Sequence, residues 1–375
     1  MNTILIVGAG PVGMVCALAL QQQGIAARVL EAQPEDARRD TRTLALSHGA
    51  RLILERLGVW NKLTDVTPIT RIHISQRGAL GVARLSADEI GVQALGYVIP
   101  YAVLTAVLKQ ALDDAAVTVE YGTAVDRIES GAAAATLHTA DDRVLAAPLV
   151  VVADGGRGEA PPKFKHDYDQ MAVVCDVKTE LPHAGQAYER FTPEGPAALL
   201  PKGDRYALVW TASSVDAQRI AALTDHEFLA ALYRHFGGRQ GLFLHASPRK
   251  TFPLKLAYTG SEAAGHVVRI GNAAQTLHPV AGQGFNIGLR DAWELASLCV
   301  DDSTGIGNAA MLAAYARGRR TDVLGGLGFT DFLVRAFSND VAPLRHARGL
   351  GLLVLEMFPP LKTFVARRMM FGARG

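Results

Sequence analysis

The chain has 375 residues, of which 49% are hydrophobic and 20% charged, a composition typical of a globular protein rather than a disordered or fibrous one. This length exceeds what one hydrophobic core usually supports, so two domains are expected. A net charge of +2, with acidic and basic residues interspersed, argues against a nucleic-acid-binding protein, and three widely spaced cysteines predict neither a disulfide framework nor a metal site.

The apolar runs are too short for a transmembrane helix, which needs about 20 residues. The N-terminal apolar stretch has no basic residue before Arg28 and is interrupted by Gly8, Gly10 and Gly13, so a signal peptide is not predicted. We therefore expect a cytoplasmic protein in a reducing compartment.

The first motif of the chain is a strand, a glycine turn and a helix. Residues 3–7 form a short β-branched run, and Gly8-Ala9-Gly10-Pro11-Val12-Gly13 follows it. Residues 14–23 predict a helix that ends at Gly24, and residues 27–30 predict a second strand with Glu31 at its end. This order is the dinucleotide-binding arrangement, although a structural glycine turn is the simpler alternative.

Each glycine has a separate role in that arrangement. Gly8 makes the turn, Gly10 lets the backbone approach a diphosphate, and Gly13 lets the helix pack closely on the strand. Glu31 would accept hydrogen bonds from a ribose, and an acid here disfavours a 2′-phosphate. The motif alone leaves FAD and NAD as alternatives.

A second glycine-rich segment follows a predicted strand at residues 267–270. It contains Gly271-Asn272-Ala273-Ala274 and, after His278-Pro279, the run Gly282-Gln283-Gly284-Phe285-Asn286, before a predicted helix that extends to about residue 300. Backbone amides at a helix N-terminus stabilise negative charge, which suits a reduced flavin better than a nicotinamide. A plain turn before a buried helix is the alternative.

The segments between these motifs are rich in short β-strand patterns. Strands are predicted at residues 70–75, 94–98, 171–177, 197–200, 206–211 and 249–253, with a hairpin at 136–147 and helices at 225–236 and 308–320. Arg317, Arg319 and Arg320 are interpreted as the solvated end of the last helix.

Basic residues gather at the C-terminus. Between Val341 and Gly375 there are six basic residues and one acid, Glu356, and the basic residues alternate with apolar runs. This pattern suits peripheral contact with a membrane surface or an acidic partner, whereas a helix packed on the protein is the alternative.

The motifs in this order resemble those of a known family. Gly8-Ala9-Gly10-Pro11-Val12-Gly13, the triplet Ala153-Asp154-Gly155 after a buried strand, and the segment 271–286 are similar to the three fingerprints of the flavoprotein aromatic hydroxylases related to p-hydroxybenzoate hydroxylase. Residues 270–279 and 96–100 resemble the ubiquinone-biosynthesis branch of that family.

The resemblance implies an α/β fold in which a Rossmann-like FAD-binding domain is interleaved with a β-rich substrate domain and followed by a helical C-terminus. The FAD-binding domain would comprise residues 1–69, 97–164 and 265–340, and the substrate domain residues 70–96 and 165–264. Residues 341–375 would form the basic tail.

The resemblance also implies a set of site residues. The cofactor-binding residues carried over from the family are Gly8, Gly10, Pro11, Val12, Gly13, Glu31, Arg42, Asp154, Gly155, Gly271, Asn272, Pro279, Gly282, Gln283, Gly284 and Asn286. No residue is expected as a covalent nucleophile. His278 is a candidate for contact with substrate or for proton transfer, with packing as the alternative.

The implied activity is hydroxylation of the aromatic ring of a polyprenylated phenol in ubiquinone biosynthesis. NADPH or NADH would reduce FAD transiently, and O2 would supply the oxygen through a flavin hydroperoxide. Other quinone-biosynthesis proteins are candidate partners. The sequence lacks the serine and arginine that usually follow Asp154 in the family, so a catalytically weak scaffold or lipid-binding subunit is one alternative. A nicotinamide-dependent dehydrogenase is another.

Overall fold

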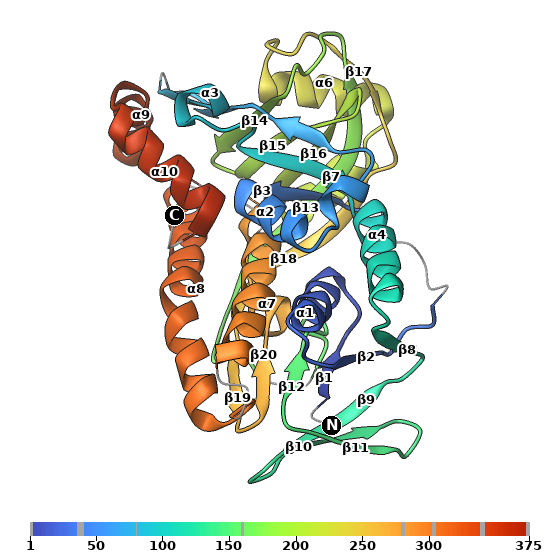
Figure 1. Cartoon of the computed structure of the whole chain (residues 1–375). Helices are drawn as coiled ribbons and strands as arrows, with labels where there is room; N and C mark the ends of the chain where they lie inside the picture. Colours follow the sequence, from blue (N-terminus) through green and yellow to red (C-terminus); the bar gives the residue numbers. More distant parts are fainter. Residues whose placement is uncertain are drawn as a thin grey trace.

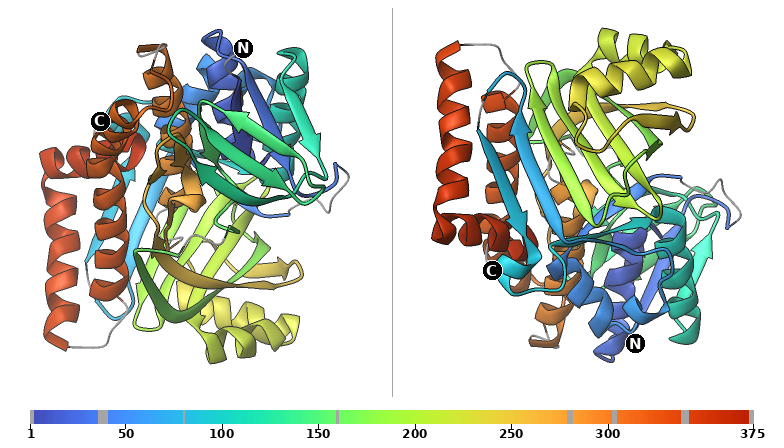
Figure 2. Two further views of the ribbon diagram at one scale, coloured as in Figure 1. Left: turned by 90° about the horizontal axis from the view of Figure 1, so that it is seen from below. Right: turned by 90° about the horizontal axis from the view of Figure 1, so that it is seen from above.

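The computed structural model describes residues 3–35, 41–79, 81–158, 161–278, 282–301, 305–337 and 342–372. Two sheets organise these residues (Figure 1). A mostly parallel six-stranded sheet contains the N-terminus, and a larger sheet lies above it in this view. Long helices near the C-terminus run along one side of both sheets (Figure 2).

The six-stranded sheet is built from short, buried, β-branched strands. Their order is β19 (Glu262–Ala264), β20 (Val267–Arg269), β12 (Val150–Val152), β1 (Ile4–Val7), β2 (Ala27–Glu31) and β8 (Thr118–Tyr121). All neighbours pair in parallel except β19 and β20. Parallel strands need both faces covered, which explains their continuous apolar character.

Both faces of this sheet are covered. Helices α1 (Pro11–Gln22), α4 (Tyr101–Asp114) and α7 (Gln283–Asp301) share one core with it. The hairpin sheet β9 (Val125–Ser130), β10 (Ala135–Thr139) and β11 (Val144–Ala147) contributes Ala135 and Leu137 to a second core, which contains Leu5 and Leu30.

The larger sheet has nine strands. Its order is β21 (Gln275–Thr276), β18 (Lys250–Tyr258), β13 (Phe164–Thr179), β16 (Arg205–Ser213), β15 (Gly195–Lys202), β14 (Gln186–Thr192), β5 (Arg71–Gln76) and β6 (Val82–Ser86), and β17 (Phe243–Ala246) pairs with β13. Helices α5 (Ser214–Ala222) and α6 (Asp225–Phe236) pack on one face around Trp210.

A small sheet joins the two larger ones. It consists of β3 (Thr43–Ser47), β7 (Gly96–Pro100) and β4 (Thr67–Ile69), and it leads into α2 (His48–Arg56) and the short helix η1 (Trp60–Lys62). The four-residue helix α3 (Ala87–Ile90) follows β6.

Three C-terminal helices pack against the β5–β6 end of the nine-stranded sheet. They are α8 (Ala309–Phe337), α9 (Ala342–Met357) and α10 (Pro359–Phe371), with Phe337 and Leu352 buried against Ala83 and Phe191. In the described ranges no single helix is long and apolar enough to span a bilayer. Helices α9 and α10 reach that length and composition only as a pair, with a 98° bend between them.

The predicted fold class is confirmed, and so are the hairpin and α6. The helix predicted at 308–320 is too short, because α8 continues to Phe337 through a glycine-rich stretch. A Cβ on Gly326 would lie 2.6 Å from Ile287 Cδ1, so close packing on α7 maintains the helix despite the low helix propensity of glycine. The domain boundaries stay a prediction.

Candidate functional site

The turn between β1 and α1 leaves the N-terminus of α1 open. Gly10 is the N-cap, no side chain caps the helix, and proline lies in its first turn. A Cβ built on Gly10 meets no atom within 4 Å. Free backbone N–H groups and the helix dipole attract anions at such an end. The turn therefore has the space and the polarity for a diphosphate.

Gly8 and Gly13 hold this turn against the neighbouring strand. Gly8 has φ +105°, and a Cβ there would lie 2.6 Å from the carbonyl oxygen of Ala153. A Cβ on Gly13 would lie 2.1 Å from the carbonyl oxygen of Gly8. Close backbone packing therefore requires glycine at both positions, whereas the fold itself leaves Gly10 room.

Glu31 lies at the end of β2 beside the glycine turn. Its carboxylate accepts hydrogen bonds from the backbone N–H of Ala9 at 2.7 Å and of Gln33 at 2.9 Å. These bonds use one lone pair on each carboxylate oxygen, and the remaining lone pairs can accept hydrogen bonds from a ligand. Glu31 is thus fixed where a ribose bound above the turn would meet it.

The loop after β12 is organised by Asp154. Its carboxylate accepts hydrogen bonds from the N–H of Gly156 at 2.9 Å and of Gly158 at 2.7 Å. Gly155 has φ +76°, and a Cβ on Gly156 would lie 2.8 Å from the carbonyl oxygen of Asn272. This loop therefore adjoins the glycine turn at one end and the segment after β20 at the other.

The segment after β20 packs directly on α1. Gly271 has φ +58°, and a Cβ there would lie 3.2 Å from Val12 Cγ1. The N–H of Gly271 donates to Asp291 Oδ2 at 3.0 Å, and Gln275 donates to the same oxygen at 2.6 Å. Asp291, on α7, thereby fixes the segment that contains Asn272. Asp291 is not among the site residues predicted from the sequence.

Arg319 supports Asp291 from α8. Its guanidinium donates to Asp291 Oδ1 at 2.7 Å, to Asp322 at 2.8 Å and to Glu294 at 3.0 Å, and the residue is 2% exposed. The interpretation of Arg319 as part of a solvated helix end is therefore wrong. The arginine balances carboxylates that would otherwise be costly to bury.

Asn286 joins α7 to β3. Its side-chain oxygen accepts from the N–H of Ser47 at 2.8 Å, and its side-chain nitrogen donates to the carbonyl oxygens of Ala45 at 3.0 Å and Gly282 at 2.7 Å. The amide is buried, and three backbone bonds occupy it. Asn286 therefore shapes the loop at the start of α7.

The other residues predicted in this loop surround the same corner. Gly282 has φ +60° and would place a Cβ 3.2 Å from Ala45 Cβ, whereas a Cβ on Gly284 would be in ordinary contact with Leu277. Gln283 donates to the carbonyl oxygen of Met369 on α10 at 3.3 Å. Pro279 lies outside the described residues.

Arg42 and His278 have different surroundings. Arg42 is exposed, and its guanidinium lies 5.6 Å from the centre of the Tyr101 ring. His278 is buried, and its ring stands edge-on to Tyr168 at 5.3 Å. Burial lowers the pKa of His278 to about 4, so the ring is neutral at neutral pH. This arrangement suits a packing role.

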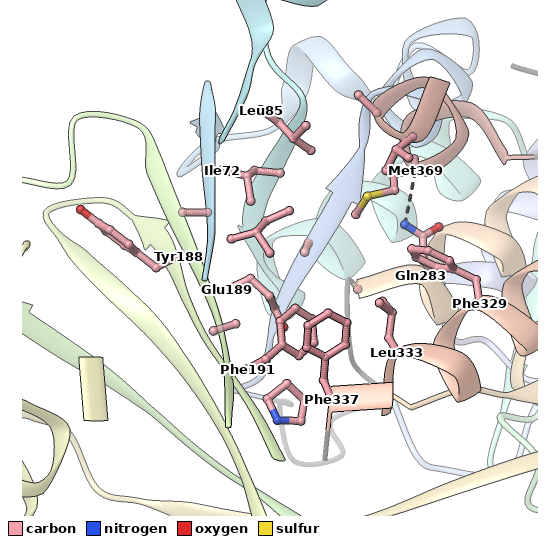
Figure 3. Close-up of a pocket in the computed structure, with 18 of the residues that line it drawn as sticks. Ile72, Leu85, Tyr188, Glu189, Phe191, Gln283, Phe329, Leu333, Phe337 and Met369 are labelled. Carbon is pink, nitrogen blue, oxygen red and sulfur yellow. Dashed lines mark hydrogen bonds between the residues drawn. The ribbon is translucent and has the colours of Figure 1, made fainter. Parts of the chain in front are cut away.

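A large apolar cavity adjoins the loop at the start of α7 (Figure 3). Its volume is about 590 Å³, within the usual range for small-molecule sites. One wall is the face of the nine-stranded sheet opposite α5 and α6, with Ile74, Glu189, Phe191 and Val209. The second wall comes from α8, α9 and α10, and Gly282, Gln283 and Asn286 line the end nearest β3.

The cavity reaches the surface between the C-terminal helices. Phe329, Phe332 and Leu344 line the cavity and are also solvent-exposed. A ligand in the cavity would thus lie between the glycine loop at one end and an exposed apolar surface at the other.

The chain is similar to a known protein family over most of its length. Residues 1–324 match the model of a protein family described as "FAD binding domain". The chain belongs to this FAD-binding family. It is 34% identical to ubiquinone hydroxylase UbiL of Rhodospirillum rubrum, over 98% of this chain and 89% of the relative. It is 30% identical to 3-demethoxyubiquinol 3-hydroxylase of Escherichia coli, over 96% of each.

A solved structure shares this fold. The crystal structure of PqsL, a probable FAD-dependent monooxygenase from Pseudomonas aeruginosa, has a TM-score of 0.78 and 22% identity, covering 93% of this chain and 99% of that one. The family match over residues 1–324 shows that FAD is the cofactor of this protein. The open turn at Gly10, the fixed carboxylate of Glu31 and the loop at Asp154 fit its ADP part.

Sequence reasoning missed two residues near the site. Asp291 follows the glycine loop by a few residues and has an ordinary helical context, so only its burial against Gly271 reveals its part. Glu189 lies in a predicted β-rich region, and no motif marks it. The sequence feature that could have identified Glu189 is its alternation with the apolar residues Ala187 and Phe191, which places an acid on the apolar face of the strand.

Proposed function

We propose that this protein hydroxylates the aromatic ring of a polyprenylated phenol in ubiquinone biosynthesis, with FAD, O2 and either NADPH or NADH. The observation that carries the proposal is the apolar cavity, which begins at the loop from Gly282 to Asn286 and opens between α8 and α9. A phenol ring at the loop would leave its prenyl chain among apolar side chains. The names of the two relatives, a ubiquinone hydroxylase and a demethoxyubiquinol hydroxylase, support this substrate class.

The proposed roles of the chain are to bind, orient and exclude water. Residues of the first two motifs (Gly8, Gly10, Pro11, Val12, Gly13, Glu31, Asp154 and Gly155) would hold the ADP part of FAD, and the segments at Gly271–Asn272 and Gly282–Asn286 would lie along the rest of the cofactor, with Arg42 nearby. Bound FAD supplies the redox chemistry with O2. The apolar lining would keep water from the reacting ring.

Peripheral membrane contact is part of the proposal, because a polyprenylated phenol resides in a lipid phase. Exposed apolar side chains cover the outer side of the C-terminal helices, including Leu350, Phe358 and Phe364 at 62%, 61% and 66% exposure. Such a patch marks a membrane or protein interaction surface. The cavity opens beside it, so substrate would enter from the bilayer.

The basic residues of the tail have a smaller part in this contact than the sequence suggested. Arg348 and Lys362 are each 8% exposed, and Lys362 pairs with Glu89 and Glu356 at 3.4 Å. Arg367 remains exposed. The tail is packed, with Gly349 against Gly81, and it presents apolar residues outward. Other quinone-biosynthesis proteins are proposed partners for the same surface.

The test uses the purified FAD-bound protein. We expect 2-prenylphenol to stimulate NADPH or NADH oxidation in air and to gain one oxygen atom, as detected by mass spectrometry, whereas phenol without a prenyl chain stimulates it weakly. Tight FAD binding without stimulated oxidation would instead support a scaffold or lipid-binding subunit.

A further inference from the structure

Glu189 is an acidic residue in an otherwise apolar wall. It lies in the middle of β14, between Ile74 on β5 and Ala198 on β15, and all three side chains line the cavity. Its neighbours along the strand, Tyr188 and Arg190, alternate to the opposite face of the sheet. Figure 3 shows Glu189 pointing into the cavity and Tyr188 pointing away from it.

The carboxyl group of Glu189 makes no hydrogen bond or ion pair with any residue that the structure describes. A carboxyl group facing an apolar space without a partner is costly, because desolvation disfavours its charged form. Burial raises the pKa of Glu189 to about 8. Such a group is retained where a ligand supplies the missing partner.

The charged groups on the surrounding elements are engaged elsewhere. Arg348 of α9 also lines the cavity, but its guanidinium donates to the carbonyl oxygen of Ala336 at 2.5 Å and lies 5.8 Å from the centre of the Phe337 ring. On the far face of the sheet, Arg190 donates to Ser75 at 3.2 Å and His73 lies against Tyr188.

The remaining charged groups nearby also have partners. Glu356 of α9 accepts from Arg84 of β6 at 2.7 Å and pairs with Lys362 of α10, and Asp331 of α8 accepts from the Tyr168 hydroxyl at 3.0 Å. Arg345, Arg367 and Arg368 lie on α9 and α10 and do not line the cavity in the described part of the chain.

Three other polar side chains on the wall bond within the protein. The Ser47 hydroxyl caps α2 by accepting from the N–H of Ala50, and the Gln283 and Asn286 amides bond to backbone carbonyls. Glu189 is the one acidic side chain in the described lining of the cavity.

We propose that Glu189 binds the phenolic hydroxyl of the substrate and accepts its proton. This assignment rests on the proposed function. The proton moves from the phenol oxygen to a carboxylate oxygen of Glu189, which leaves a phenolate and a neutral carboxylic acid. A phenolate ring is more electron-rich than a phenol ring and so is the better substrate for an electrophilic oxygen. The residue would also fix which ring carbon faces the loop at Gly282.

The experiment compares two soluble probes, 2-prenylphenol and its methyl ether, which cannot donate a proton. Each is titrated into FAD-bound protein, and binding is followed by the change in flavin absorbance. At pH 9, above the pKa of Glu189, wild-type protein should bind the phenol about tenfold more tightly than the ether, since a hydrogen bond to a charged carboxylate is among the strong ones. Glu189→Gln should reduce this preference to less than about threefold, and Glu189→Asp should restore part of it.

A pH profile separates a proton acceptor from a merely structural residue. Turnover of 2-prenylphenol should rise with pH through a value near 8 in wild-type protein, and this rise should be absent in Glu189→Gln. The matched control is Glu194→Gln, which removes a glutamate of the β14–β15 turn that pairs with Arg77 at the surface. It should leave both the preference and the profile unchanged.

The outcomes are distinguishable. If wild-type protein binds and hydroxylates 2-prenylphenol and Glu189→Gln keeps the same preference and pH profile, the assignment of Glu189 is overturned and the proposed function stands. If wild-type protein neither binds nor oxidises the phenol while it retains FAD, both are overturned.

Discussion

Glycines that look equivalent in the sequence have different structural roles. A Cβ on Gly13 would collide with the Gly8 carbonyl, whereas a Cβ on Gly10 would enter open space above the N-terminus of α1. Gly13 is therefore required by the fold. The requirement at Gly10 comes from the ligand, whose diphosphate would occupy that space.

Gly10→Val should consequently lose FAD while staying folded. The backbone at Gly10 has φ −70° and ψ 167°, which valine adopts readily, so no strain is expected. The measurement is the ratio of flavin to protein absorbance after purification, with circular dichroism to report folding. Gly13→Val is the contrasting variant and should lose folded protein as well. Normal flavin content in Gly10→Val would contradict the placement of the diphosphate.

Glu189 should also affect stability in a pH-dependent way. Its pKa is raised from 4.5 to about 8 in the folded protein, so the folded state binds more protons than the unfolded state between these values. Stability should therefore fall as pH rises from about 4.5 to about 8, by at most about 1.4 kcal/mol per pH unit for one proton. In Glu189→Gln this pH-dependent loss of stability should be absent. The free energy of unfolding, measured by urea unfolding of the apoprotein at pH 5 and pH 8, tests this. An equal loss in both proteins would contradict the raised pKa.

At the scale of elements, α7 and α8 are joined by buried charges that also support the cofactor segment. Asp291 bonds to Gly271 on one side and to Arg319 on the other, and Arg319 shares Asp322 with Arg290. Breaking a buried ion pair leaves its partner uncompensated, which costs about 3–5 kcal/mol.

Arg319→Leu should therefore destabilise the protein strongly, because Asp291 loses its cation and Asp322 keeps only Arg290. Thermal unfolding followed by circular dichroism measures the loss. Arg320→Leu, one residue along the same helix and exposed, is the control and should change the free energy of unfolding by less than about 0.5 kcal/mol. Equal melting temperatures for the two variants would show that the network contributes little.

At the scale of the whole molecule, the outer surface of α9 and α10 exposes several large apolar side chains. Replacing Leu350, Phe358 and Phe364 by aspartate should weaken binding to anionic phosphatidylglycerol vesicles at least tenfold in a sedimentation assay. The variant loses apolar side chains that would insert into the bilayer, and its new negative charges are repelled by the anionic lipid. FAD content and turnover of 2-prenylphenol should remain near normal.

Val215→Asp is the control for this prediction. Val215 is 77% exposed on α5, which packs on the face of the nine-stranded sheet opposite the cavity, so vesicle binding should be unchanged. If the triple aspartate variant still binds vesicles like wild-type protein, another surface collects the substrate.

The sequence was sufficient for the features that local rules determine. The turn after β1 could be predicted because Gly8 and Gly10 lie between a strand and a helix. The short β-rich runs predicted five of the nine strands of the larger sheet, namely β5, β13, β15, β16 and β18, but not β14. The cavity could not be predicted, because Ile74, Glu189 and Leu333 meet only after strands and helices far apart in the chain have assembled. The burial of Arg319 and Arg348 was missed for the same reason. Arg319 bonds to Asp291 and Glu294 on α7, and Arg348 bonds to the carbonyl oxygen of Ala336 on α8.

The order of strands in the six-stranded sheet has a consequence for synthesis of the protein on the ribosome. Strand β1 at residues 4–7 pairs with β12 at 150–152, and β12 pairs with β20 at 267–269. Helix α7, which covers α1, ends at Asp301. A nascent chain that ends before Val267 therefore lacks the last parallel strand, and one that ends before Asp301 lacks part of the helix that packs on α1. FAD can be captured only once most of the polypeptide has emerged, and until then the edge of β12 is open to pairing with other chains.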